Sequence, residues 1–197
     1  PFNFEETALL IRNILSEEVF GLSRYVGGTI SSRVIRHSDQ MEPLIDQVLG
    51  SIPEELGRRR FRNGLAEVVV NAVYYGAKQE RGDRKDQWQF DVALEPDEEV
   101  TVEWCYDEEK AGVSVTDQKG RLGKKDILYW LERNMTRTEN GLSRGFFDKH
   151  GKGLFITRET NDRFIINVKA GRRTEVILIN YREGMYDGHR PLWIHEL

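Results

Sequence analysis

The stretch from Phe61 to Ala77 constrains this chain more than any other part of the sequence. It reads F-R-N-G-L-A-E-V-V-V-N-A-V-Y-Y-G-A and is apolar on nearly every side, which is typical of a helix inside a protein core. Asn63, Glu67 and Asn71 follow one another at four-residue spacing, so their side chains stack on one helix face. Burying such groups without partners costs on the order of 1–3 kcal/mol each. The polar line therefore predicts either a ligand or metal beside the helix, or hydrogen bonds to neighbouring backbone.

Composition narrows the class of protein. The chain has 197 residues, enough for one α/β globular domain, and its formal net charge of -4 argues against a general binder of nucleic-acid backbone. The single cysteine, Cys105, excludes an internal disulfide, and no cysteine and histidine group has zinc spacing. No run approaches the roughly 18 apolar residues of a membrane span, so we expect a cytoplasmic protein without membrane or nucleic-acid partners. The chain opens on Pro1, which suits a processed form or part of a longer protein.

The hydrophobic pattern divides the chain into alternating helices and strands, and the close-set strands indicate an antiparallel meander. We therefore expect an α/β (α+β) two-layer sandwich, with helices on one face of a largely antiparallel sheet. The expected elements are helices over Glu5–Phe20, from Ser38 or Asp39 to Leu49, from Pro53 (capped by Ser51) to Gly76, over Lys124–Arg133 and over Phe155–Asn161, and strands over Thr29–Ile35, Trp88–Leu94, Val100–Tyr106, Gly112–Thr116, Phe164–Val168 and Thr174–Tyr181.

Three regions organise the chain. Residues 1–28 form an N-terminal helical extension, which either packs on the sheet or mediates a homodimer. Residues 29–182 form the main domain. Residues 183–197 form a C-terminal tail that no pattern places.

Two glycine-containing segments add to the polar helix. One expected strand runs into Asp117, followed by Gly120 and Gly123, a pattern most often found in a simple turn. The run Gly151–Gly153 precedes an expected helix, where free amides suit a phosphate, although such glycines are often plain loop residues. Each feature alone is weak.

In this order and spacing the features resemble the GHKL superfamily of ATP-binding domains, which includes gyrase and the histidine kinases. The chain is most similar to the small bacterial anti-sigma-factor serine/threonine kinases. The resemblance runs from about Thr29 to Tyr181 and rests mainly on E-V-V-V-N-A-V-Y-Y-G, followed by V-T-D, H-G-K-G-L-F and R-T-E-V. It implies a Bergerat-type ATP-binding fold that uses ATP and Mg²⁺.

The resemblance also implies a role for each matched residue. Asn71 would hold Mg²⁺ through its amide oxygen, and Glu67 would act as general base. Asp117 would accept a hydrogen bond from the adenine amino group, supported by Thr174. The remaining implied nucleotide contacts are close backbone approach at Gly120 and Gly123, phosphate-binding amides at Gly151 and Gly153, and charge partners at Lys152 or Arg144.

Two positions depart from the family pattern. The first glycine box, usually D-x-G-x-G, reads D-Q-K-G-R-L-G, so Gly120 comes one position late and Lys119 stands where a glycine is usual. A side chain there would crowd the adenine. Tyr75 replaces the histidine late in the N box.

The segment from Asn134 to Gly153 has almost no periodicity and contains four glycines. Long loops in compact domains are usually lids or binding loops. We expect its 134–150 part to be mobile without nucleotide and to order over the phosphates when ATP binds.

We therefore expect a serine/threonine protein kinase of the anti-sigma type, active in bacterial signalling. Its protein partners would be a sigma factor and a small anti-anti-sigma-like domain that it phosphorylates. Two alternatives stay open. The altered glycine box favours a regulatory interaction module that is catalytically silent or binds no nucleotide. The catalytic domain of a histidine kinase ranks lower, because His37 follows an expected strand and lies in no suitable helix.

Overall fold

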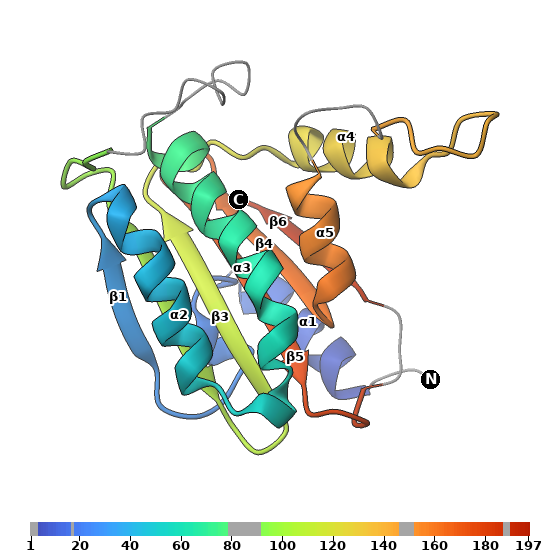
Figure 1. The fold of residues 1–197 in the computed structure, drawn as a ribbon. Helices are drawn as coiled ribbons and strands as arrows, with labels where there is room; N and C mark the ends of the chain where they lie inside the picture. The colour runs from blue at the N-terminus through green and yellow to red at the C-terminus, as the bar shows by residue number, and fades with distance from the viewer. Residues whose placement is uncertain (1–3, 17, 79–91, 146–151, 187–189) are drawn as a thin grey trace.

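The structure is a computed structural model that describes residues 4–16, 18–78, 92–145, 152–186 and 190–197. These residues form one six-stranded open sheet with helices packed against it (Figure 1). The strand order is β1-β2-β3-β5-β4-β6, and every pair is antiparallel except β4 with β6. The predicted α/β class with a largely antiparallel sheet is thus confirmed. The strands are β1 Ser31–Ile35, β2 Val100–Tyr106, β3 Lys110–Asp117, β4 Arg163–Lys169, β5 Arg173–Tyr181 and β6 Leu192–Glu196.

The central strands β3 and β5 are buried along nearly their whole length, because both faces of the sheet are covered there. Their register places Asp117 opposite Thr174. The hairpin of β4 and β5 turns at Gly171, whose φ of 70° lies in the left-handed region. The strand expected over Trp88–Leu94 lies mostly outside the described residues, and at its end Ala93 forms only an isolated bridge with His37.

Three helices cover one face of the sheet: α2 (Met41–Ser51), α3 (Arg58–Asn71) and α5 (Gly153–Thr160). A fourth, α4 (Lys124–Met135), lies across the end of the sheet where β3 finishes (Figure 1). The main hydrophobic core fills the space between these helices and the sheet. Its largest fully buried side chains include Phe61, Leu65, Phe164 and Leu178.

The central helix begins later than the sequence predicts. A short 3₁₀ turn, Glu54–Leu56, follows Pro53, and α3 starts only after Gly57, which is left-handed with φ of 76°. A left-handed residue cannot continue a helix, so Gly57 separates the two segments. Ser51 is not the cap of α3: it is the last residue of α2, and its hydroxyl donates to the Val48 carbonyl at 2.7 Å.

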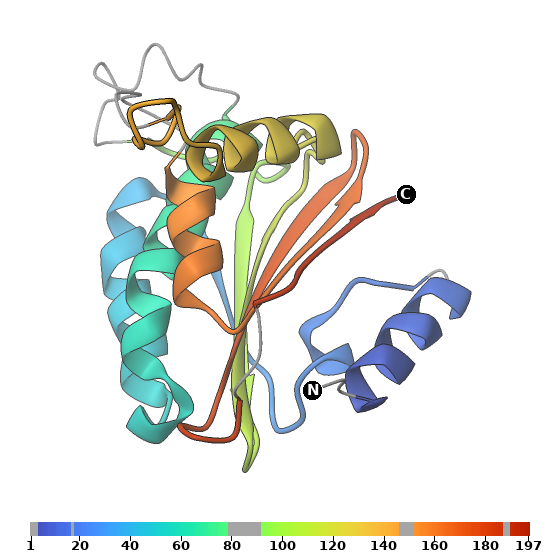
Figure 2. The ribbon, with the colours of Figure 1, turned by 90° about the vertical axis from the view of Figure 1, so that its right-hand side faces the viewer.

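The opposite face of the sheet carries the N-terminal segment, so the expectation of helices on one face was incomplete. Helix α1 (Phe4–Ser16) ends earlier than the predicted Phe20, and a 3₁₀ turn at Leu22–Arg24 follows (Figure 2). This turn packs on the sheet in a second hydrophobic cluster. At the other end of the chain, β6 adds an edge strand parallel to β4, from residues that no sequence pattern placed. Among the described residues no helix is both long and apolar enough to cross a bilayer.

Candidate functional site

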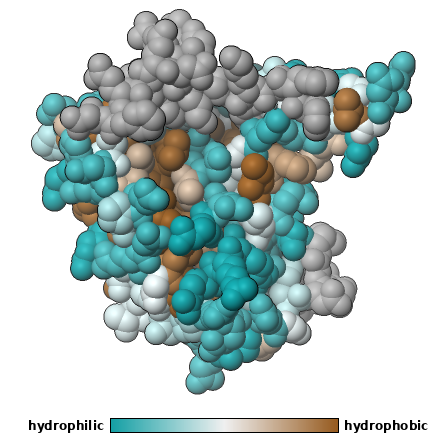
Figure 3. Space-filling view, in the orientation of Figure 1, coloured by the Kyte–Doolittle hydropathy of each residue, from teal (hydrophilic) through white to brown (hydrophobic). Residues whose placement is uncertain are grey.

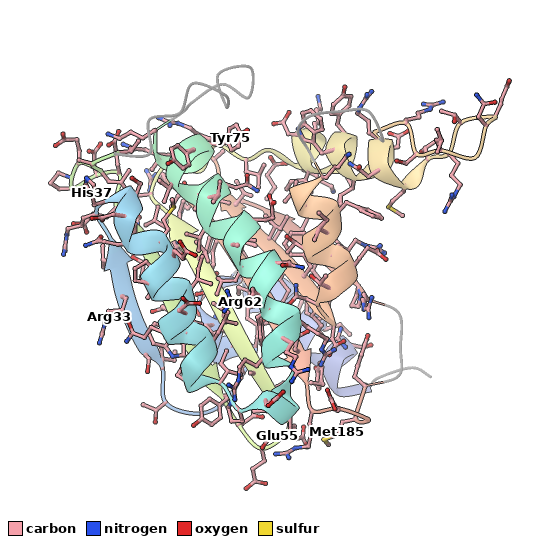
Figure 4. The ribbon with its side chains drawn as sticks, in the orientation of Figure 1. Arg33, His37, Glu55, Arg62, Tyr75 and Met185 are labelled. Carbon is pink, nitrogen blue, oxygen red and sulfur yellow. The ribbon has the colours of Figure 1, made fainter. Side chains whose placement is uncertain are left out.

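The polar line predicted on the central helix lies along one side of α3. Glu67, Asn71 and Tyr75 are half-buried and Asn63 is exposed, so the line runs from the surface into a partly enclosed region. Figure 4 shows Tyr75 at the end of this helix that lies far from Glu55. A half-buried carboxylate and amide at one helix end can meet a solvent-borne ligand without full desolvation.

Helix α3 does not stay α-helical along the whole polar line. After Asn71 the chain widens into a π-helical turn, Ala72–Ala77. Tyr75 continues the four-residue spacing of the polar line beyond Asn71 and lies within this wider turn. Tyr74 is buried, and burial together with the nearby Glu67 charge raises the pKa of Tyr75. The sequence did not reveal this turn.

Arg121 secures the end of the π turn. Its guanidinium donates to the Gly76 carbonyl at 2.9 Å and to the Ala77 carbonyl at 3.0 Å. Cations are favoured at the carbonyl end of a helix, where the last acceptors lack helical partners. Arg121 lies inside the D-Q-K-G-R-L-G run but was not among the predicted site residues.

Glu67 lies against the first residue of α5. A side chain built at Gly153 would collide with the Glu67 carboxylate, with Cβ only 2.9 Å from Glu67 Cδ. The predicted general base and a predicted phosphate-binding glycine are therefore neighbours in space. Gly64, within α3, allows a similar close approach near the other end of α5, because its Cβ would meet Asn161 Nδ2 at 2.6 Å.

Asp117 lies at the end of β3 and is only 4% exposed. Its Oδ1 accepts the backbone N–H of Lys119 at 2.9 Å and of Gly120 at 3.1 Å. The π turn closes over it, since a Cβ at Gly76 would come 2.7 Å from Asp117 Oδ2. Burial raises the pKa of the Asp117 carboxyl, while the two backbone hydrogen bonds oppose that rise.

Thr174 faces Asp117 from the neighbouring strand β5. It is 3% exposed, and its Oγ1 makes no hydrogen bond of good geometry with the described residues, although the hydroxyl is close enough to lower the pKa of Asp117. Buried hydroxyls nearly always have a partner.

The two glycines after Asp117 serve the protein's own turns. Gly120 has φ of 59°, and a Cβ there would run into the β4–β5 turn, 2.8 Å from Arg172 N and 2.7 Å from Arg173 N. Gly123 precedes α4, and its carbonyl accepts the amides of Asp126 and Ile127, both at 3.1 Å. The described contacts thus explain Gly120 without a ligand, whereas Gly123, with φ of -86°, makes carbonyl contacts that any residue could make.

Lys119 extends toward the loop before β2. Its ammonium pairs with the exposed Asp97 at 2.5 Å, and this contact lowers the pKa of Asp97. Lys78 pairs in the same way with Glu98, also at 2.5 Å. The side chain at the unusual position of the glycine box is therefore held by a carboxylate of the protein itself.

The other residues predicted to contact phosphate are either outside the described residues or exposed at the surface. Gly151 and part of the 134–150 segment, residues 146–150, lie outside the described residues. Lys152 is exposed and directly precedes α5. Arg144 is exposed in a short hairpin after α4, where its amide donates to the Thr136 carbonyl at 2.9 Å. No contact among the described residues joins Arg144 to Glu67 or Asp117.

The described residues contain no group of three or more His, Cys, Asp or Glu side chains that could hold a metal ion. A metal bound through the Asn71 amide would therefore need most of its ligands from elsewhere, such as phosphates and water. On the face seen in Figure 3, hydrophobic residues form a band in the middle over the α2 and α3 region, with mostly hydrophilic residues on either side of it and below it.

No family model matches this chain, and its sequence matches no curated protein.

Proposed function

We propose that this protein binds ATP with Mg²⁺ and transfers phosphate to a serine or threonine of a partner protein, in the manner of a GHKL-type anti-sigma kinase. One observation carries the proposal. Glu67 contacts the N-terminal residue of α5, Gly153, while the end of the same helix contacts Asp117 at Gly76. The polar helix thus links an acidic group at a helix N-terminus with a buried carboxylate at a strand end.

Each group has a chemistry that suits this reading. The Asn71 amide oxygen is the kind of hard ligand that Mg²⁺ accepts beside phosphate oxygens. Bound Mg²⁺ would neutralise charge on the transferred phosphoryl group. Glu67 would take the proton of the attacking hydroxyl, and the free amides of the α5 N-terminus would face the phosphates. Asp117, with Thr174 beside it, would accept the adenine amino group.

The sheet with α2, α3 and α5 on one face is compatible with a Bergerat-type ATP-binding fold, which we include in the proposal. A sigma factor or an anti-anti-sigma-like domain would be the protein partner. Lys119 supports the adenine site indirectly, because its pairing with Asp97 holds the ammonium at a loop carboxylate.

A nucleotide titration followed by calorimetry, with and without Mg²⁺, tests the proposal. We expect saturable ATP binding that tightens when Mg²⁺ is added. The Asp117→Asn variant should weaken binding in both conditions, whereas Asn71→Ala should remove only the Mg²⁺-dependent gain. Absence of binding at millimolar ATP and Mg²⁺ would refute the kinase.

A second candidate is a regulatory interaction module that binds no nucleotide. The observation that favours it is the occupancy of Asp117: its Oδ1 already accepts two backbone amides, and the side chain is almost fully buried. The same titration separates the two functions, since the module would show no saturable ATP binding with or without Mg²⁺.

A further inference from the structure

The N-terminal arm, defined as α1 together with residues 18–26, covers the face of the sheet opposite α3 (Figure 2). Helix α1 lies farther from the sheet than the turn that follows it. It contributes the partly buried Leu9, while Ile11 is 51% and Leu15 is 78% exposed. The attachment of the arm therefore depends on residues 18–26.

Residues 18–26 contact the sheet through a hydrophobic cluster that is separate from the main core. The two clusters lie on opposite faces of the sheet, so removing the arm would leave the packing of α2, α3 and α5 in place. The cluster consists of Leu22, Tyr25 and Val26 from the arm and of Cys105, Ile165, Ile177 and Ile179 from the sheet.

A fully buried carboxylate fastens the arm. Both oxygens of Glu175, on β5, lie within hydrogen-bond distance of the Gly21 N–H, at 3.1 and 3.0 Å. The Asn167 amide donates to Glu175 Oε2 at 2.9 Å and to the Val19 carbonyl at 2.8 Å, which connects strand, carboxylate and arm. A buried carboxylate is unfavourable without such donors, so the Gly21 N–H stabilises Glu175 together with Asn167 and with Arg173, whose guanidinium lies 3.4 Å from Glu175 Oε1.

Gly112, within β3, leaves the space on the sheet into which the arm packs. Glycine weakens a strand interior, yet a Cβ at Gly112 would come 2.7 Å from Val26 Cγ2 and 2.9 Å from Leu22 Cδ1. The absence of a side chain at Gly112 is what lets the arm lie flat on the sheet. Beyond the arm the chain passes through Gly28, whose φ of 94° only glycine adopts readily, before entering β1.

We propose that the arm is a displaceable strap: it detaches as a unit at the glycines before β1, with Glu175 as its lock, while the sheet stays folded. Detachment would expose a strip of aliphatic side chains around a carboxylate that keeps only Asn167 and Arg173 of the sheet as partners. The occupant of this surface is the chain's own arm, which presents one backbone N–H to Glu175 and aliphatic side chains to the strip.

The only cysteine of the chain reports on this opening. Cys105 lies under the arm at 1% exposure, and burial raises the pKa of its thiol to about 11, so a maleimide should react only after the arm has opened. We expect Cys105 of the native protein to be labelled faster than it would be if only global unfolding exposed it. The labelling rate should also depend only weakly on urea concentration.

Two variants test the roles of Glu175 and Gly112 in holding the arm. Glu175→Ala and Gly112→Ala should each raise the labelling rate by about 10- to 100-fold, because the first removes the acceptor of the Gly21 N–H and the second displaces Leu22 and Val26 of the arm. Glu139→Ala, an exposed glutamate in the hairpin after α4, serves as the control and should leave the rate unchanged.

Amide exchange of β3 and β5 distinguishes strap opening from general loss of stability. We expect their protection to be the same in the wild type and in Gly112→Ala. The proposal is overturned if wild-type labelling shows the urea slope and free energy of global unfolding. It is also overturned if, in both variants, amide exchange in β3 and β5 accelerates by the same factor as maleimide labelling of Cys105. The sheet would then open together with the arm.

Discussion

Glu67 and Gly153 lie so close that any side chain at residue 153 would collide with the Glu67 carboxylate. The contact joins the C-terminal half of α3 to the first turn of α5. A carboxylate is favoured near a helix N-terminus, where unpaired amides carry partial positive charge. The proposed phosphate-binding turn and the proposed general base therefore depend on each other's position.

We expect Gly153→Ala to destabilise the fold by about 1–3 kcal/mol, because the methyl group must displace Glu67 or the start of α5. Gly50→Ala is the matched control: it lies within helix α2 and meets nothing within 4 Å, so it should be neutral or stabilise by about 0.4–1 kcal/mol. Urea unfolding of both variants measures the difference. Equal effects of the two substitutions would show that the Glu67 contact is loose.

The variants Glu67→Gln and Asn71→Ala should separate catalysis from binding. Glutamine keeps the size of Glu67 but cannot take a proton, so phosphate transfer should fall by about 10²- to 10⁴-fold while ATP binding survives. Asn71→Ala should weaken Mg·ATP binding as well as transfer. ATP affinity and phosphorylation of candidate partner domains are the measurements. If Glu67→Gln transfers phosphate at the wild-type rate, Glu67 is not the base.

The buried Asp117 predicts a pH dependence of stability. Its pKa is raised in the folded protein, so the folded state holds the proton more tightly than the unfolded chain does. Stability from this group is therefore present below its ordinary pKa of about 3.9 and is lost as pH rises through the higher folded value. As pH rises through that window, we expect the wild type to lose stability relative to Asp117→Asn. Denaturant unfolding from pH 3 upward would show this, and a difference that stays constant with pH would contradict it.

Arg121 should hold the π turn closed. Removing its two hydrogen bonds in Arg121→Ala should lower the local stability of residues 72–78 by about 0.5–1.5 kcal/mol, seen as faster amide exchange there. The exposed Arg33 on the edge strand β1 (Figure 4), whose guanidinium donates to the neighbouring Ser32 carbonyl, is the control. Exchange of residues 72–78 should be the same in Arg33→Ala as in the wild type. Unchanged exchange in Arg121→Ala would mean that the π turn is stable without its cap.

The sequence by itself determined the elements whose signal is local. Strand β2 spans Val100–Tyr106 as predicted, and α4 starts at Lys124 as predicted, because hydrophobic period and nearby turn residues are properties of short segments. The polar line on the central helix was visible for the same reason. The class of fold followed from the order of these segments.

Only the tertiary structure decided how these segments meet. No local pattern indicates that Ala72–Ala77 widens into a π turn, or that residues 192–196 join the sheet beside β4. Gly112 and Gly120 read as weak strand and turn residues, yet each is fixed by the close approach of a distant segment. Glu175 reads as a surface charge between Thr174 and Val176, and becomes a buried anchor because the N-terminal arm brings the Gly21 amide to it. Such contacts depend on residues far apart in the chain, so their free energy appears only once the sheet and both of its covers have assembled.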